Sequence, residues 1–256
     1  MNTEAEIKKQ LKTLKLSGAS EALELRISEA QQHSLSYSEF LANLLLDEIE
    51  VRNMNKLKRL IHTARIGHNQ TIETFDFMFN PSVSGARIRE LALCNYLKKG
   101  ENIIFLGPTG TGKTHLAKAL CHKACQKHYS VLFFSAYQFF KELDTAMLND
   151  KIDKLMKKLL KTDLLVIDDF AFKKISQQSS EYLYALVDAR YQTKSIILTS
   201  NRAIADWEAI FPDAVMANAI LDRLAHNAHQ IKINGDSFRK KMSPHSKSLD
   251  NKKERL

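Results

Sequence analysis

The chain has 256 residues, of which 44% are hydrophobic, and carries a formal net charge of +9. This length and composition allow a sizeable buried core and exclude a fibrous or disordered chain. The excess of Lys and Arg favours a polyanionic partner, nucleic acid ahead of an anionic membrane surface, because clustered cations displace counterions condensed on phosphates. Three cysteines without CxxC spacing argue against a disulfide framework. No segment approaches the roughly twenty apolar residues of a membrane span, so we expect a soluble, cytoplasmic protein without a membrane partner.

Residues 4 to 65 show the apolar periodicity of helices almost throughout. A helix is expected to start at Ser36-Tyr37-Ser38-Glu39, where a Ser followed three residues later by a Glu has the arrangement of a capping box. We therefore predict a small all-α domain over residues 1–66.

The last predicted helix of this domain has a one-sided positive charge, because no carboxylate lies between Glu50 and Glu73. Such a run fits a solvated helix face and contact with DNA phosphates about equally well. The candidate DNA-binding residues in this run are Arg52, Lys56, Lys58, Arg59 and Arg65.

Residues 67–86 lose the helical pattern and contain the breakers Gly67, Asn80-Pro81 and Gly85. Three phenylalanines alternate in this stretch, at positions 75, 77 and 79, as in an extended segment. We interpret the stretch as a linker whose aromatic rings pack on the next domain rather than stack on bases.

Residues 87–242 alternate helical stretches with short apolar runs, which is typical of an α/β fold. We expect a five-stranded, mostly parallel sheet with helices on both faces. The strand-like runs are 102–106, 131–135, 164–167, 195–199 and 230–233. Residues 243–256 have almost no apolar content, so a disordered basic tail is expected there.

A phosphate-binding loop follows the first of these strands and opens a helix. Its backbone N–H groups and the positive helix end would converge on phosphate oxygens. Lys113 would place its charge on the β and γ phosphates, and the Thr114 hydroxyl would bind Mg²⁺. Two glycines, Gly110 and Gly112, would allow the backbone to approach the phosphates closely. The whole loop is the candidate nucleotide site: Gly107, Pro108, Thr109, Gly110, Thr111, Gly112, Lys113 and Thr114.

Polar side chains end two later strands. The apolar run 164–167 ends on Asp168 and Asp169, at the edge of the sheet where ligands of open α/β folds bind. Asp168 is expected to hold Mg²⁺ and Asp169 to orient the attacking water. Asn201 follows the run 195–199 and is a candidate sensor of the γ phosphate, provided that this strand lies between the strand at 102–106 and the strand at 164–167.

The chain resembles AAA+ ATPases of the IstB type, helpers of insertion-sequence transposition that are similar to DnaC-type helicase loaders. Besides the loop and the strand end at Asp168-Asp169, the resemblance rests on segments spread over nearly the whole chain. These segments are Leu14-Lys15-Leu16-Ser17-Gly18, Thr199-Ser200-Asn201-Arg202, Ile220-Leu221-Asp222-Arg223-Leu224 and Gly235-Asp236-Ser237-Phe238-Arg239.

The resemblance implies ATP rather than GTP, a homo-oligomer with nucleotide at subunit interfaces, binding of double-stranded DNA, and delivery of that DNA to a partner transposase. Arg223 matches the segment of the arginine finger, which would act on the γ phosphate of a neighbouring subunit. A surface arginine in a helical pair is the alternative for Arg223. Arg239 is a weaker candidate for the same neighbourhood, and Arg190 and Arg202 are weaker still. Further DNA contacts are expected from Lys154, Lys157 and Lys158.

One residue departs from the family pattern: many AAA+ proteins have Glu where this chain has Asp169, so hydrolysis is expected to be slow or partner-dependent. Three other functions use a similar core. A helicase loader would differ mainly in its N-terminal partner. A small-molecule kinase would need an Arg-rich lid, and a GTPase would need an Asn-Lys-x-Asp motif after the sheet pattern, which the sequence lacks.

Overall fold

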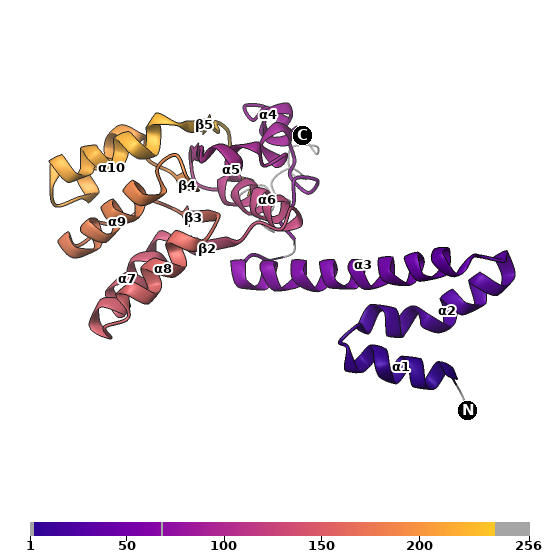
Figure 1. Ribbon diagram of the computed structural model, residues 1–256. Helices are drawn as coiled ribbons and strands as arrows, with labels where there is room; N and C mark the ends of the chain where they lie inside the picture. Colours follow the sequence, from indigo (N-terminus) through magenta and orange to yellow (C-terminus); the bar gives the residue numbers. More distant parts are fainter. Residues whose placement is uncertain (1–2, 68, 239–256) are drawn as a thin grey trace, which may run out of the picture. The chain divides into compact units, whose positions relative to one another are not determined.

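The computed structural model describes residues 3–67 and 69–238 (Figure 1). The chain divides into two compact units, Met1–Arg59 and Leu60–Leu256. The predicted basic tail 243–256 and the predicted end of the ATPase domain at residue 242 lie outside the described residues. Within the described part of the chain, no helix is long and apolar enough to span a membrane.

The first unit contains α1 (Thr3–Thr13), α2 (Ser17–His33) and most of α3 (Tyr37–Ala64). The predicted capping box starts α3, since the Glu39 N–H donates to Ser36 Oγ and the Ser36 N–H donates to the Glu39 carboxylate. At the start of α2, Gly18 lies against α3 so closely that a Cβ there would come within 2.8 Å of the Asp47 carbonyl oxygen. Gly18, which belongs to the N-terminal segment that resembles the IstB-type ATPases, therefore allows α2 to pack closely on α3.

The buried carboxylate of Glu48 completes this contact. It accepts a hydrogen bond of 3.1 Å from the Ala19 N–H, one of the donors that the first turn of α2 leaves without a helical partner. Arg52, predicted to bind DNA, pairs with Glu48 one helical turn before it at 2.6 Å and also donates to the Lys15 carbonyl oxygen, while its side chain remains 59% exposed. The Arg52 cation thus compensates the buried charge of Glu48, and its role in DNA binding stays a prediction.

The second unit is built on a sheet with the strand order β2-β3-β4-β1-β5, in which every pair of neighbours is parallel. The expected α/β fold with five strands is confirmed. The strands are β1 (Asn102–Leu106), β2 (Val131–Ser135), β3 (Leu164–Asp168), β4 (Ser195–Ser200) and β5 (Ala228–Lys232).

The helices of the second unit connect these strands. Two short helices precede β1 where the helical pattern of residues 88–98 fits a single one, because Cys94 takes the left-handed conformation (φ 60°) and is buried between them. The helices are α4 (Gly85–Ala92), α5 (Asn95–Lys99), α6 (Lys113–Gln126), α7 (Ala136–Leu148), α8 (Ile152–Lys161), α9 (Gln177–Arg190), a 3₁₀ helix (Ile204–Ile210) and α10 (Ala214–His226).

The position of β4 decides which side chains can meet. It lies between β1 and β3, with Leu106 opposite Ser200 and Ile167 opposite Leu198. Every residue of β1, β3 and β4 is buried, so these three strands lie in the interior of the second unit. Their carboxyl ends therefore form one edge, from which the phosphate-binding loop and the two aspartates project.

Candidate nucleotide-binding site

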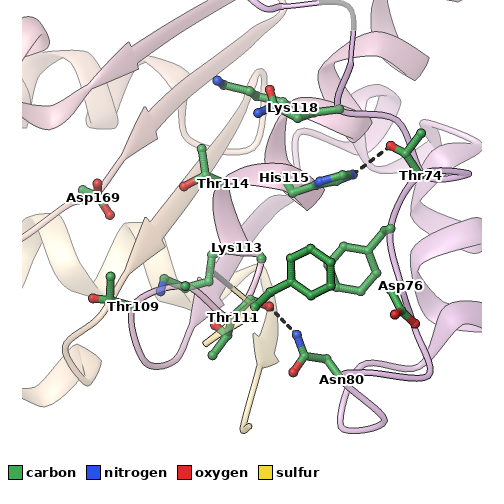
Figure 2. Close-up of a pocket in the computed structure, with 15 residues that line it drawn as sticks. Thr74, Asp76, Asn80, Thr109, Thr111, Lys113, Thr114, His115, Lys118 and Asp169 are labelled. Carbon is green, nitrogen blue, oxygen red and sulfur yellow. Dashed lines mark hydrogen bonds between the residues drawn. The ribbon is translucent and has the colours of Figure 1, made fainter. Parts of the chain in front are cut away.

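The phosphate-binding loop connects the end of β1 with the start of α6 at Lys113. Lys113 is buried, and its Nζ lies 2.7 Å from the Gly107 carbonyl oxygen and 2.8 Å from that of Pro108. The loop borders a cavity of about 310 Å³, and Figure 2 shows Lys113, Thr114 and Asp169 around it. A cation, a helix N-terminus and the backbone N–H groups of a glycine-rich loop at one cavity suit a polyphosphate.

A buried carboxylate lies beside the loop. The Thr114 hydroxyl is 2.9 and 3.1 Å from the two carboxylate oxygens of Asp168, and the Thr199 hydroxyl donates to Asp168 Oδ1 at 2.5 Å. Asp168 is only 7% exposed, and burial raises the pKa of its carboxyl.

These residues fit a magnesium ion. The described residues contain no cluster of three or more His, Cys, Asp or Glu side chains that could hold a metal by themselves. Mg²⁺ in nucleotide sites needs only one or two carboxylates, because it keeps waters and phosphate oxygens as its other ligands. A divalent cation next to Asp168 would also compensate the carboxylate charge that burial disfavours.

Thr199 is a site residue that the sequence reasoning missed. Besides donating to Asp168, its hydroxyl accepts a hydrogen bond of 2.9 Å from the backbone N–H of Asp169. It therefore fixes both aspartates to β4. The available signal was a polar side chain within a fully buried strand, which must find a partner inside the protein.

The structure places Asp169 at the cavity and Asn201 beside the same edge of the sheet. Asp169 is exposed, lines the cavity and has a left-handed backbone (φ 56°). Asn201 directly follows β4, in the strand position that a phosphate sensor requires, and is exposed. The described lining of the cavity includes Asp169 and does not include Asn201.

The predicted linker forms a wall of the cavity. The sequence alone predicts only that the linker packs on the next domain. Phe75 is buried against the loop: a Cβ on Gly112 would come within 2.5 Å of the Phe75 ring. The Asn80 side chain donates to the Thr111 carbonyl oxygen at 2.7 Å, and His115 Nε2 lies 3.2 Å from the Thr74 hydroxyl, as Figure 2 shows. Gly112 thus makes room for the linker.

The segment after β5 also contacts the phosphate-binding loop. The Phe238 N–H donates to the Gly110 carbonyl oxygen at 3.0 Å, and a Cβ on Gly110 would come within 2.1 Å of Ser237 Oγ. A Cβ on Gly107 would meet the Ile233 carbonyl oxygen at the same distance of 2.1 Å. These two loop glycines therefore admit the protein's own C-terminal segment. Arg239 lies outside the described residues.

Comparison with known proteins decides the family. The model of the IstB-like ATP binding protein family matches residues 9–246. The chain belongs to this family. A protein named as an ATP-binding protein of insertion sequence IS5376 from Geobacillus stearothermophilus is 38% identical over 210 residues, which cover 82% of this chain and 84% of that protein. One named for insertion sequence IS21 from Pseudomonas aeruginosa is 35% identical and covers 92% of this chain and 89% of its own length.

Solved structures support the AAA+ P-loop fold of this IstB-like protein. The DnaC helicase loader has a TM-score of 0.57 at 24% identity, over 65% of this chain and 97% of that one. DnaA from Aquifex aeolicus, solved with AMPPCP, has a TM-score of 0.58 at 24% identity, over 68% of this chain and 53% of that one. At this identity the likeness concerns the fold alone.

The candidate arginine finger of the IstB-like chain lies on α10 and is held by α9. Arg223 pairs with Asp188 at 2.9 Å, and its guanidinium lies 5.4 Å from the centre of the Tyr184 ring. The surface pair considered for Arg223 therefore exists, although its carboxylate comes from another helix. Arg202 is exposed just beyond β4.

Arg190 has a packing role, contrary to its inclusion among the weaker candidates. It is 1% exposed and donates to the carbonyl oxygens of Leu159, Thr162, Asp163 and Ser195 at 2.7–3.1 Å. Burial lowers the pKa of its guanidinium to about 10. The Arg190 guanidinium thus satisfies carbonyl oxygens at the C-terminal end of α8. Because it is buried, it cannot reach a neighbouring subunit.

Several predicted DNA-binding residues meet at one groove of about 570 Å³ beside α7 and α8. Arg65 lies there, paired with Glu142 at 2.6 Å. We call the basic groove the surface lined by Arg65, Lys141, Lys151, Lys154 and Lys158. Lys157 is exposed on α8 outside the described lining of this groove, and the exposed Lys56, Lys58 and Arg59 belong to the first unit.

Proposed function

We propose that this chain is an ATP-dependent helper of DNA transposition, which oligomerises on double-stranded target DNA and delivers it to a partner transposase. The observation that carries the proposal is the bond from the Thr114 hydroxyl to the buried Asp168 at the phosphate-binding loop, in a chain of this family. That arrangement supports nucleotide-controlled assembly. Relatives named as ATP-binding proteins of insertion sequences support the role in transposition.

In this proposal, Thr114 and Asp168 would hold Mg²⁺, which would supply positive charge to the phosphates of ATP. Lys113 exchanges its two loop carbonyls for phosphate oxygens. Asp169 orients the attacking water, and Asn201 contacts the γ phosphate. Since Asp is one methylene shorter than Glu, Asp169 reaches less far and turnover is slow, so ATP serves more to stabilise the assembly than to drive rapid cycles.

Arg223 completes the site of a neighbouring subunit. Its bond to Asp188 holds the guanidinium ready on α10, and assembly would transfer it from that carboxylate to the γ phosphate. Mixing Arg223→Ala chains with Asp169→Asn chains tests this role, because mixed interfaces contain one intact site. Recovery of ATP hydrolysis above either variant alone is expected, and no recovery at any mixing ratio would refute action in trans.

The basic groove binds the phosphate backbone. Five cations line it, and Glu142 already pairs with one of them, so the groove keeps a clear positive excess. Contacts to phosphates carry no sequence information, and binding should therefore be largely indifferent to sequence and should weaken steeply with salt.

The partner is tested with the full-length protein and an ATP analogue. Immobilised protein on DNA should retain the transposase of its own insertion sequence and should not retain the replicative helicase. Retention of the helicase alone would replace this proposal with that of a helicase loader.

A further inference from the structure

An aromatic and basic surface lies directly after the two aspartates, and the nucleotide site does not use it. Phe172 is 71% exposed and is followed by the exposed Lys173 and Lys174; we call these three residues the aromatic tip. Tyr137 on α7, which is 64% exposed, lines the same hollow of about 540 Å³. A large apolar ring left in water at this position forgoes the stabilisation of burial, which points to a partner.

The aromatic tip is mounted on a fixed base. Before it, the Phe170 N–H donates to the Thr199 carbonyl oxygen at 2.7 Å, and the Phe170 ring packs on buried Trp207 with centroids 4.9 Å apart. After it, the Ile175 N–H donates to the Ile210 carbonyl oxygen at 3.0 Å. Phe172 is therefore exposed on a short segment that is anchored to the core at both ends.

The charge around the hollow selects its occupant. Lys141, Lys173 and Lys174 line it, and the carboxylate of Asp144 accepts a hydrogen bond of 2.8 Å from the Ser179 hydroxyl. Lys141 also lines the basic groove, so the two surfaces are continuous. Exposed rings bordered by lysines match DNA, which offers phosphates to the cations and base faces to the rings.

We propose that Phe172 inserts at a distorted base step of the bound duplex, while Lys173 and Lys174 hold the flanking phosphates. This inference rests on the proposed binding of double-stranded DNA. Apolar side chains that enter a base step partly unstack it and kink the duplex. Phe172 lies three residues after Asp169, so distortion of the DNA and the nucleotide site share one short segment of chain.

The test compares two duplexes of the same sequence, one perfect and one with a small bulge in which unstacking is already achieved. Affinities of the full-length protein with an ATP analogue are measured by fluorescence anisotropy over a range of salt. The wild type should prefer the bulged duplex by about tenfold, given the usual strength of base–aromatic contacts. Phe172→Ala should lose this preference without changing the slope of log affinity against log salt, and Phe172→Trp should keep it.

The matched variants separate stacking from charge. Lys173→Gln with Lys174→Gln should keep the preference for the bulge and reduce the salt slope by about 0.9 for each phosphate that a lysine no longer neutralises. Val215→Ala, which shortens an 81% exposed apolar side chain on α10, should change neither quantity. A Phe172→Ala protein that still prefers the bulged duplex would refute the insertion of Phe172 and leave the proposed function standing. A wild type without salt-dependent binding to either duplex would overturn the proposed function as well.

Discussion

Replacing Thr199 by Val tests whether β4 holds the two aspartates in place. Val keeps the shape of the side chain and removes its hydroxyl. Asp168 then loses a hydrogen-bond donor at 2.5 Å, and the Asp169 N–H loses its acceptor at 2.9 Å. Thr199→Ser is the matched control, because it keeps the hydroxyl and loses only a buried methyl group.

The expected losses differ in size. A hydrogen bond to a buried charged group contributes roughly 1.5–3 kcal/mol, and an unpaired N–H adds to this, so Thr199→Val should destabilise the protein by about 2–4 kcal/mol. Thr199→Ser should cost about 1 kcal/mol, the contribution of one buried methyl group. For a unit of this size, the larger loss corresponds to a fall in Tm of about 5–15 °C.

The difference should also depend on pH. Burial raises the pKa of Asp168, whereas the hydroxyls of Thr199 and Thr114 lower it, so removing one hydroxyl raises this pKa further. A carboxyl whose pKa is raised by folding stabilises the protein at low pH and loses this contribution as the pH rises. The penalty of Thr199→Val should therefore be larger at neutral pH than in acid.

The assay is thermal unfolding followed by the fluorescence of Trp207, the single tryptophan, which is buried against Phe170. It therefore reports on the ATPase unit. A Tm for Thr199→Val equal to that of Thr199→Ser, or a difference between them that does not change with pH, would refute the role given to the Thr199 hydroxyl.

Three further variants test other parts of the structure. Lys113→Ala should abolish ATP binding in calorimetric titration, and unchanged affinity would exclude the phosphate-binding role. Arg190→Met leaves four buried carbonyl oxygens without their donor and should cost about 3–5 kcal/mol in urea unfolding, so a variant as stable as the wild type would contradict its packing role. The double variant Lys154→Gln with Lys158→Gln should lower the salt slope of DNA binding by about 1.8. Lys127→Gln, which changes an exposed lysine outside the lining of the basic groove, should leave the slope unchanged. Equal slopes for the double variant and the wild type would show that DNA does not bind in the basic groove.

The parts of the site that local patterns determine could be predicted from the sequence. The phosphate-binding loop needs glycines, a lysine and a threonine at fixed spacing between a strand and a helix, and all of these are neighbours along the chain. The strand end at Asp168-Asp169 is equally local, since four apolar residues precede two carboxylates. Local patterns do not determine the order of the strands. The predicted role of Asn201 requires β4 to lie between β1 and β3, and the structure has this order.

The parts that depend on tertiary packing could not be predicted. Thr199 reaches Asp168 because of the register between β3 and β4, which periodicity does not specify. Glu48 and Arg52 are one turn apart on α3, but the burial of the Glu48 carboxylate comes from its contact with the Ala19 N–H of α2, which the sequence does not show. Arg190 looked like any other arginine in a helix, and only the structure shows the four carbonyl oxygens converging on it.

In the proposed function ATP controls binding to DNA, and one measurement tests this control most directly. The affinity of the full-length protein for a duplex of arbitrary sequence is determined over a range of salt, with Mg²⁺ and a non-hydrolysable ATP analogue and without nucleotide. We predict tight binding that falls steeply with salt when the analogue is present, and much weaker binding without it. Equal affinity under both conditions, or affinity that does not change with salt, would contradict the account.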